Sequence, residues 1–162
     1  MTSLNPTIRI GTQITERILA LNKHISKQQA QVKAKELLEM VMIPDAKIHL
    51  DKYPFELSGG MRQRVMFAIA RACDPKILIL DEPTTGLHFA DVAHLLRVLE
   101  RLRDAGVAVV LTTHDMHEAE ALADHVYIVD RGRVTAQGTV AALTVNGSLE
   151  DAFLHHTTGD RP

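Results

Sequence analysis

Residues 77–82 read Ile-Leu-Ile-Leu-Asp-Glu, in which four consecutive apolar side chains precede two carboxylates. Such a run predicts a β-strand that is covered on both faces, as in a parallel sheet. Open α/β sheets bind ligands at the edge where their strands end, which is where Asp81 and Glu82 are expected. One carboxylate there suits a hydrated Mg²⁺, and its neighbour suits orienting a water for attack on a phosphoryl group. The alternative is a strand that ends in a solvated acidic turn.

The sequence after residue 76 alternates strand and helix patterns. The predicted strands lie at 77–80, 107–111, 126–129 and 133–137. Helices are predicted at 92–102 and 115–123. The last two strands are expected to pair as an antiparallel hairpin around the turn at 130–132. The fold class is therefore α/β, with βαβ units that form a partial, truncated parallel sheet and a C-terminal hairpin.

The sequence before residue 74 has helical patterns and no convincing strand. Ser26 and Gln29 have the spacing of a capping box, and the helix that they start is expected to end before Pro44. A second helix is predicted to start at Ser58 and to be stopped by Pro75. We therefore expect a helical subdomain over residues 1–73 and an α/β part over residues 74–162.

Composition excludes several classes of protein. The chain has 162 residues, 46% of them hydrophobic and 23% charged, which is typical of a globular protein rather than a disordered or fibrous one. A net charge of −2 gives no excess of positive charge for nucleic acid, so no nucleic-acid partner is expected. The single cysteine, Cys73, excludes an internal disulfide framework. With no membrane span or signal peptide in the sequence, we expect a soluble, intracellular chain.

The predicted start of the second helix has the composition of an anion site. Residues 57–64 read Leu-Ser-Gly-Gly-Met-Arg-Gln-Arg, so that two glycines follow a serine. Glycines leave the backbone N–H groups of a helix start unobstructed, and the helix dipole favours a phosphate there. The alternative is an ordinary N-cap serine with flexible neighbours. Arg62 and Arg64 are similarly open to two interpretations, a contact with phosphate or a solvated, salt-bridged helix face.

These segments together resemble the ATPase subunits of ATP-binding cassette (ABC) transporters, members of the P-loop NTPase class. Residues 57–61 match the family's LSGGQ signature motif, with Met61 in the last place. Residues 77–82 match the Walker B strand, and His114, in the sequence Leu-Thr-Thr-His-Asp at 111–115, matches the switch histidine. The resemblance implies that residues 1–73 form the helical signature-motif subdomain. Residues 74–162 would then form the Walker B and switch-histidine part of the ATPase core.

The resemblance also implies a role for each matching residue, with ATP and Mg²⁺ as the ligands. Ser58, Gly59, Gly60 and Met61 are expected to contact a nucleotide held by a second subunit. Asp81 is expected to serve Mg²⁺, Glu82 the attacking water and His114 the γ-phosphate. The implied partners are an ABC ATPase subunit, identical or different, and a membrane permease. The implied location is cytoplasmic, on the periphery of the inner or plasma membrane.

Different parts of the chain resemble different branches of this family. Residues 1–73 are similar to oligopeptide and dipeptide importers, residues 81–92 to the cassette ATPase of DNA excision repair, and the sequence from Leu111 to drug exporters. This mixture predicts a recombined or engineered sequence. A DNA-repair role is a further alternative, although no zinc-ligand cysteines or basic surface support it.

Two departures from the family pattern bear on activity. The Walker A pattern G-x-x-x-x-G-K-S/T does not occur in the sequence, and the chain starts just past the position of the family's Q-loop glutamine. His88 stands where the family usually has the D-loop aspartate. We therefore expect weak ATP binding and negligible ATP turnover by the isolated chain. The alternative function is a non-catalytic interaction module that pairs with an intact ATPase subunit.

Overall fold

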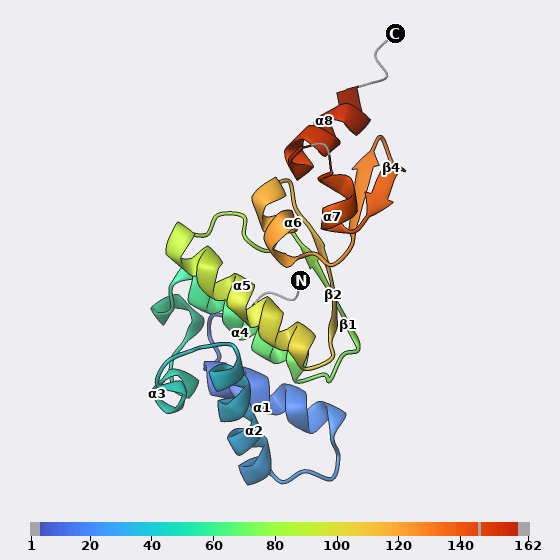
Figure 1. The fold of residues 1–162 in the computed structure, drawn as a ribbon. Coiled ribbons are helices and arrows are strands. Elements are labelled where there is room, and N and C mark those ends of the chain that lie inside the picture. Colours follow the sequence, from blue (N-terminus) through green and yellow to red (C-terminus); the bar gives the residue numbers. More distant parts are fainter. Residues whose placement is uncertain (1–3, 146, 159–162) are drawn as a thin grey trace. The chain divides into compact units, whose positions relative to one another are not determined.

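The computed structural model describes residues 4–145 and 147–158 (Figure 1). Within these ranges the chain forms two compact units, one up to Leu111 and one from Thr112 onward. The sequence-based boundary between residues 73 and 74 concerns subdomains and stays a prediction. No helix among the described residues has both the length and the apolar character needed to cross a membrane.

The first unit begins with a cluster of helices that pack on one another. Its elements are α1 (Ile10–Leu21), α2 (Lys27–Met40), α3 (Ala46–Leu50), the 3₁₀ turn η1 (Pro54–Glu56) and α4 (Gly59–Arg71). The capping box predicted at Ser26 is confirmed, because Ser26 Oγ accepts from Gln29 N–H at 3.2 Å and Gln29 Oε1 accepts from Ser26 N–H at 2.9 Å. The cluster's core consists of apolar residues at helical spacing, such as Ile10, Ile14 and Ile18 on α1 and Ala30, Ala34 and Leu38 on α2.

The α/β part of the first unit is β1 (Ile77–Asp81), α5 (Phe89–Asp104) and β2 (Ala108–Thr112). The two strands pair in a partial parallel sheet, and α5 packs against α4 (Figure 1). The prediction that β1 is covered on both faces is wrong, since Ile77 is 61% and Ile79 is 72% exposed while Leu80 is buried. The apolar run therefore predicted the strand correctly, but the neighbouring elements leave part of its apolar surface in solvent.

The second unit contains α6 (Met116–Leu122), β3 (Val126–Asp130), β4 (Arg133–Gly138), α7 (Val140–Leu143) and α8 (Leu149–Thr158). The predicted hairpin is confirmed, with Asp130 opposite Arg133 across a two-residue turn. Both turn residues, Arg131 and Gly132, have positive φ, as a type I′ hairpin turn requires. Within the second unit, β3 and β4 form a two-stranded antiparallel sheet.

The helical core makes a direct prediction about stability. Phe67 on α4 is 1% exposed, whereas Phe55 in η1 is 72% exposed and stacks on Tyr53 at a centroid distance of 5.6 Å. Phe67→Ala should lower the free energy of unfolding by about 3–5 kcal/mol, because it leaves a cavity in the core. Phe55→Ala should cost less than about 1.5 kcal/mol, because it removes one exposed aromatic contact. Urea denaturation monitored by circular dichroism measures both, and equal losses would contradict this account of the core.

Candidate functional site

The first turn of α4 starts at a serine cap, as the sequence predicts. Ser58 has extended backbone angles (φ −62°, ψ 164°), and its Oγ accepts a hydrogen bond from Met61 N–H at 3.2 Å. Ser58 and Gly59 are exposed, and Met61 is half-buried. A serine hydroxyl that accepts one hydrogen bond can still donate its own hydrogen. Ser58 therefore caps the helix and keeps the capacity to donate to an anion.

The two glycines after Ser58 pack against the segment that follows Glu82. Gly60 is buried, and a Cβ built on it would lie 2.3 Å from Cγ and 2.4 Å from Oδ1 of Asp91, in the first turn of α5. The nearest atom to a Cβ built on Gly59 is Cδ2 of Leu87, at 3.9 Å, which is an ordinary van der Waals contact. Gly60 is thus required by packing, whereas the position of Gly59 has room for a side chain.

Arg64 lies one turn along α4 from Gly60 and is close to the contact between Gly60 and Asp91. Its guanidinium donates to the carbonyl oxygens of Gly60 at 3.3 Å and Met42 at 2.6 Å. Burial lowers the pKa of this guanidinium, and the negative charge of Asp91 opposes that shift. The interpretation of Arg64 as part of a solvated helix face is therefore wrong, since the residue is 5% exposed. Sequence reasoning named Arg64 but did not predict its burial, and it missed Asp91, for which the only local sign was an acidic residue near a predicted helix start.

The two predicted acidic residues lie where β1 ends. Asp81 is the last residue of the strand, and the chain turns at Glu82, whose φ of 42° lies in the left-handed region. The turn is held by Thr85, whose hydroxyl donates to Glu82 Oε2 at 2.9 Å and whose N–H donates to the Glu82 carbonyl at 3.2 Å. Both Asp81 and Glu82 are exposed residues. A left-handed residue costs roughly 1–2 kcal/mol outside glycine, so the contacts of this turn must hold Glu82 there.

His114 lies in the second unit, in the turn between β2 and α6. The turn is ordered by its neighbours: Thr113 Oγ1 donates to Glu118 Oε2 at 3.0 Å and accepts from Asp115 N–H at 3.0 Å. Asp115 caps α6 by accepting from His117 N–H at 2.9 Å. His114 itself is an exposed residue. The other candidate residues lie in the first unit.

The donor groups at the end of β1 fit one way of binding a divalent cation. The described residues contain no group of three or more His, Cys, Asp or Glu side chains that could hold a metal. Mg²⁺ in phosphoryl-transfer sites is usually bound by one or two carboxylates together with substrate phosphates and waters. An exposed aspartate at the end of a strand suits that arrangement, whereas a protein-only cage of ligands is not formed in the described part of the chain.

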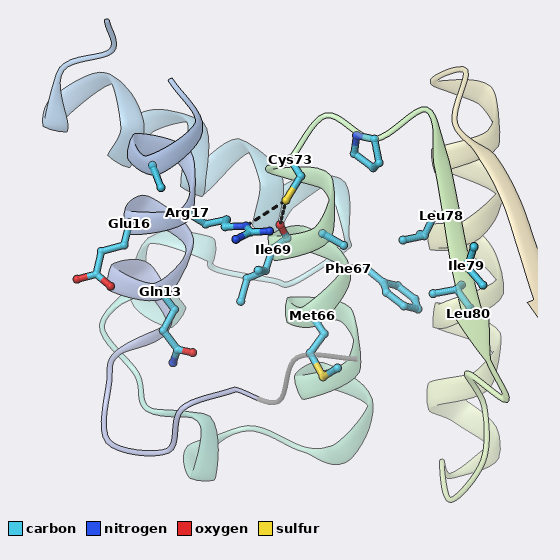
Figure 2. Close-up of a pocket in the computed structure, with 13 residues that line it drawn as sticks. Gln13, Glu16, Arg17, Met66, Phe67, Ile69, Cys73, Leu78, Ile79 and Leu80 are labelled. Atoms are coloured by element: carbon cyan, nitrogen blue, oxygen red, sulfur yellow. Dashed lines mark hydrogen bonds between the residues drawn. The ribbon is translucent and has the colours of Figure 1, made fainter. Parts of the chain in front are cut away.

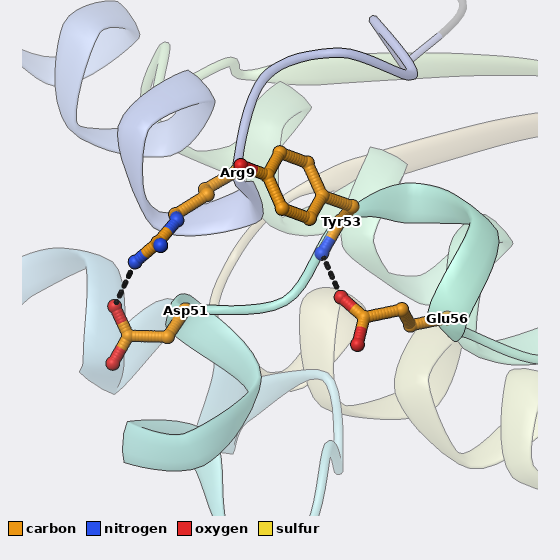
Figure 3. Close-up of polar contacts among 4 residues, drawn as sticks. All are labelled: Arg9, Asp51, Tyr53 and Glu56. Atoms are coloured by element: carbon orange, nitrogen blue, oxygen red, sulfur yellow. Dashed lines mark hydrogen bonds and ion pairs between the residues drawn. The ribbon is translucent and has the colours of Figure 1, made fainter.

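Polar contacts fix the segment that leads into Ser58 (Figure 3). Arg9 Nη1 lies 3.3 Å from Asp51 Oδ1, and the Arg9 guanidinium carbon lies 5.8 Å from the centre of the Tyr53 ring. Tyr53 N–H donates to Glu56 Oε2 at 2.7 Å. The backbone adds a hydrogen bond from Ile10 N–H to the Lys52 carbonyl at 2.9 Å. Residues 51–56 are thereby tied to the start of α1 just before the chain enters α4.

A pocket of about 660 Å³ lies among α1, α4 and β1 (Figure 2). Its apolar lining includes Met66, Phe67, Leu78 and Leu80. The polar residues Gln13, Glu16 and Arg17 also line it, and Arg17 Nε lies 3.1 Å from Cys73 Sγ. The lining residues include none of the candidate site residues, so the pocket and the candidate site are separate features of the first unit.

The chain is similar in sequence to ATP-binding proteins that are named for dipeptide and glutathione import. The chain is 46% identical over 142 residues to the probable D,D-dipeptide transport ATP-binding protein DdpD of Escherichia coli, covering 87% of this chain and 43% of that protein. It is 44% identical over 147 residues to the dipeptide transport ATP-binding protein DppD of Lactococcus lactis, an alignment that covers 90% of this chain and 42% of that protein. With the glutathione import ATP-binding protein GsiA of Escherichia coli it shares 44% identity, covering 86% and 22%. The chain thus spans less than half the length of these relatives.

Comparison with solved structures supports the fold. The structure superposes on the dimeric ATP-binding cassette MJ0796 bound to ADP and Pi with a TM-score of 0.71 and 25% identity, covering 84% of this chain and 58% of that chain. It superposes on cbiO1 of Clostridium perfringens, part of an ABC transporter complex, with a TM-score of 0.75 and 26% identity, covering 88% and 55%.

A sequence model of one family extends over the helical cluster and β1. The family is described as ABC transporter, and its model matches residues 2–85, just over half of the chain. This stretch contains the serine cap, the glycine pair and both acidic residues described above. The chain therefore belongs to the ABC transporter family and has part of the α/β fold of its ATP-binding cassette.

Proposed function

We propose that this chain is the signature-bearing part of an ATP-binding subunit of an importer for peptides or peptide-like solutes. The importer relatives align with 86–90% of the chain, which favours one importer lineage over a recombined sequence. The observation that carries the proposal is the start of α4, where Ser58 caps the helix and an exposed Gly59 follows it. Its partners would be a membrane permease and a second ATPase subunit, at the cytoplasmic side of the membrane.

In this proposal, each candidate residue has its own role in binding or hydrolysing ATP. Ser58 Oγ and the N–H groups of Gly59 and Gly60 would donate hydrogen bonds to the γ-phosphate of a nucleotide held by the partner, with Met61 beside them. Asp81 would hold Mg²⁺, which neutralises charge on the phosphates when bound. Glu82 would orient the attacking water, and His114 would contact the γ-phosphate. Positioning and electrostatics supply nearly all of the catalysis in this reaction, so small displacements of these groups matter.

A second candidate function is a non-catalytic module that offers its signature motif to an intact ATPase partner. Such a module would need only the serine cap and the exposed Gly59 at the start of α4, which this chain has. The two functions share the contact between α4 and a partner's nucleotide. They differ in whether Glu82 and His114 act on a nucleotide.

The contact through Ser58 can be tested with a matched pair of serine caps. Ser26 and Ser58 both accept from the N–H three residues on, each at 3.2 Å, so arginine at either position removes the same cap. Ser58→Arg should reduce the stimulation of a Walker-A-bearing importer subunit at least tenfold, because one charge-assisted hydrogen bond is worth about 1.5–3 kcal/mol. Ser26→Arg should lose only about 1 kcal/mol of stability. The ATPase rate during a titration measures the effect, and equal rates for the two variants would refute the contact.

The substitution Gly59→Ala tests whether Gly59 is needed for contact with the nucleotide or for the packing of the chain. Packing allows a Cβ there, and alanine is a better helix former than glycine by about 1 kcal/mol in a helix interior. We therefore expect stability to be unchanged or slightly higher, while stimulation of the partner falls because a methyl group crowds the phosphate. Thermal unfolding and the same titration measure the two effects. If stimulation were retained in full, Gly59 would not contact the nucleotide.

Turnover by the isolated chain tests the roles of the two acidic residues. We expect negligible ATP hydrolysis, and binding of fluorescent ATP that depends weakly on Mg²⁺ and loses that dependence in Asp81→Ala. The measurements are phosphate release and fluorescence anisotropy on the purified chain. Multiple turnovers that disappear in Glu82→Gln would show that the isolated chain is an active ATPase and would exclude the module.

A further inference from the structure

His49 is a buried titratable side chain that the proposed function does not use. It lies on α3 and is 9% exposed. Its Nδ1 lies 3.3 Å from the carbonyl oxygen of Asp45, and its Nε2 lies 3.3 Å from the ammonium nitrogen of Lys52. Because both ring nitrogens have a partner, a change in the protonation of the ring must also change one of these contacts.

The two partners assign the protonation state of the ring. A carbonyl oxygen can only accept a hydrogen bond, so Nδ1 of His49 carries the hydrogen and donates to Asp45. A lysine ammonium group can only donate, so Nε2 is unprotonated and accepts from Lys52. The geometry therefore fits one form of the imidazole, neutral and with its hydrogen on Nδ1. A second proton, on Nε2, would place two positive charges 3.3 Å apart with no acceptor between them.

The helices packed against α3 offer no negative charge to a protonated ring. These helices are α1 and α2, and their buried residues are apolar apart from Thr15 on α1. In the described part of the chain, Lys52 is the one charged side chain that contacts His49. The charged residues on or beside the three helices are otherwise mostly exposed, and they include Arg9, Lys35, Glu39, Asp45, Lys47 and Asp51.

Lys52 also ties residues 51–56 to the start of α1. Its carbonyl oxygen accepts a hydrogen bond from Ile10 N–H at 2.9 Å. Ile10 is the first residue of α1, and the residue before it, Arg9, makes no side-chain capping bond, so Lys52 satisfies an N–H group that the helix leaves open. Arg9 instead pairs with Asp51 at 3.3 Å (Figure 3). His49 therefore holds the side chain of a residue whose backbone caps α1.

We propose that His49 and Lys52 form an acid-sensitive latch on the segment that leads into Ser58. With His49 neutral, the latch is closed and the carbonyl of Lys52 is held at the start of α1. When His49 takes up a proton, Lys52 moves away from the ring and its bond to Ile10 weakens. The trigger is the charge change that histidine side chains ordinarily undergo at roughly pH 5–8. This inference is independent of the proposed function, since it concerns the helical cluster and not the contact with a nucleotide.

Hydrogen exchange of the Ile10 amide, measured by NMR on the full chain at about pH 7.5 and about pH 5.5, tests the latch. The protection factor of Ile10 should fall at least about threefold at the lower pH, which is the order expected for one weakened hydrogen bond. In Lys52→Met, which keeps an apolar stem without the charge, this fall should disappear. Lys47→Met is the matched control, because it removes an exposed lysine of the same helix and should keep the full response.

An amide elsewhere in the helical cluster distinguishes the latch from general loosening. Ala72 N–H donates to the Ala68 carbonyl at 2.9 Å at the end of α4, and its protection should be the same at both pH values. An equal fall at Ala72 and Ile10 would overturn the proposal. So would an unchanged Ile10 in the unaltered chain, or the same fall at Ile10 in Lys52→Met.

A second measurement uses the unaltered chain, in case Lys52→Met does not fold. The nitrogen NMR signals of a histidine ring show which nitrogen carries the hydrogen. At about pH 7.5 we expect the hydrogen of His49 on Nδ1, and a hydrogen on Nε2 would exclude the bond from Lys52 and overturn the proposal. His94 is the comparison, because its Nδ1 lies 2.8 Å from the Ala90 carbonyl, also four residues back. If Lys52→Met folds, its His94 signals should match those of the unaltered chain while its His49 signals shift.

Discussion

Position 60 must be a glycine because the carboxylate of Asp91 occupies the space that a side chain would take. This contact sets how closely α4 approaches α5. Since α5 starts soon after the turn at Glu82, the same contact places the serine cap of α4 next to the segment that carries the acidic residues. Arg64 strengthens the arrangement from the side of α4, through its hydrogen bonds to Gly60 and Met42. The candidate residues of the first unit therefore depend on one close packing contact.

The features that the sequence predicted correctly are those whose causes lie within a few residues. The Ser26 capping box, the Ser58 cap and the positive-φ turn at Arg131 and Gly132 each need only a side chain or a glycine at a fixed offset. The start of α1 had no such signal, because its N-cap residue, Arg9, makes no side-chain capping bond. Local chemistry thus predicted element boundaries wherever a local hydrogen bond sets them.

The features that the sequence did not predict depend on residues far apart in the chain. Arg64 is buried because its guanidinium reaches Met42, 22 residues away in sequence, and faces Asp91 on another helix. The apolar run of β1 led to the prediction of two covered faces, yet Ile77 and Ile79 are exposed. Apolar side chains show that burial of a strand would be favourable. Whether the strand is buried depends on which helices and strands pack against it. Pattern alone therefore predicted the strand and not its environment.

The two glycines of the signature motif call for different explanations. Packing against Asp91 accounts for Gly60 without any nucleotide. It does not account for Gly59, which is exposed and whose nearest neighbour, Leu87, would meet a Cβ at an ordinary 3.9 Å. Glycine costs helix stability relative to alanine, so a glycine that packing does not require needs another reason. A glycine at position 59 leaves its backbone N–H group accessible to an anion, and this access is a reason for glycine there. The case for nucleotide contact therefore rests more on Gly59 than on Gly60.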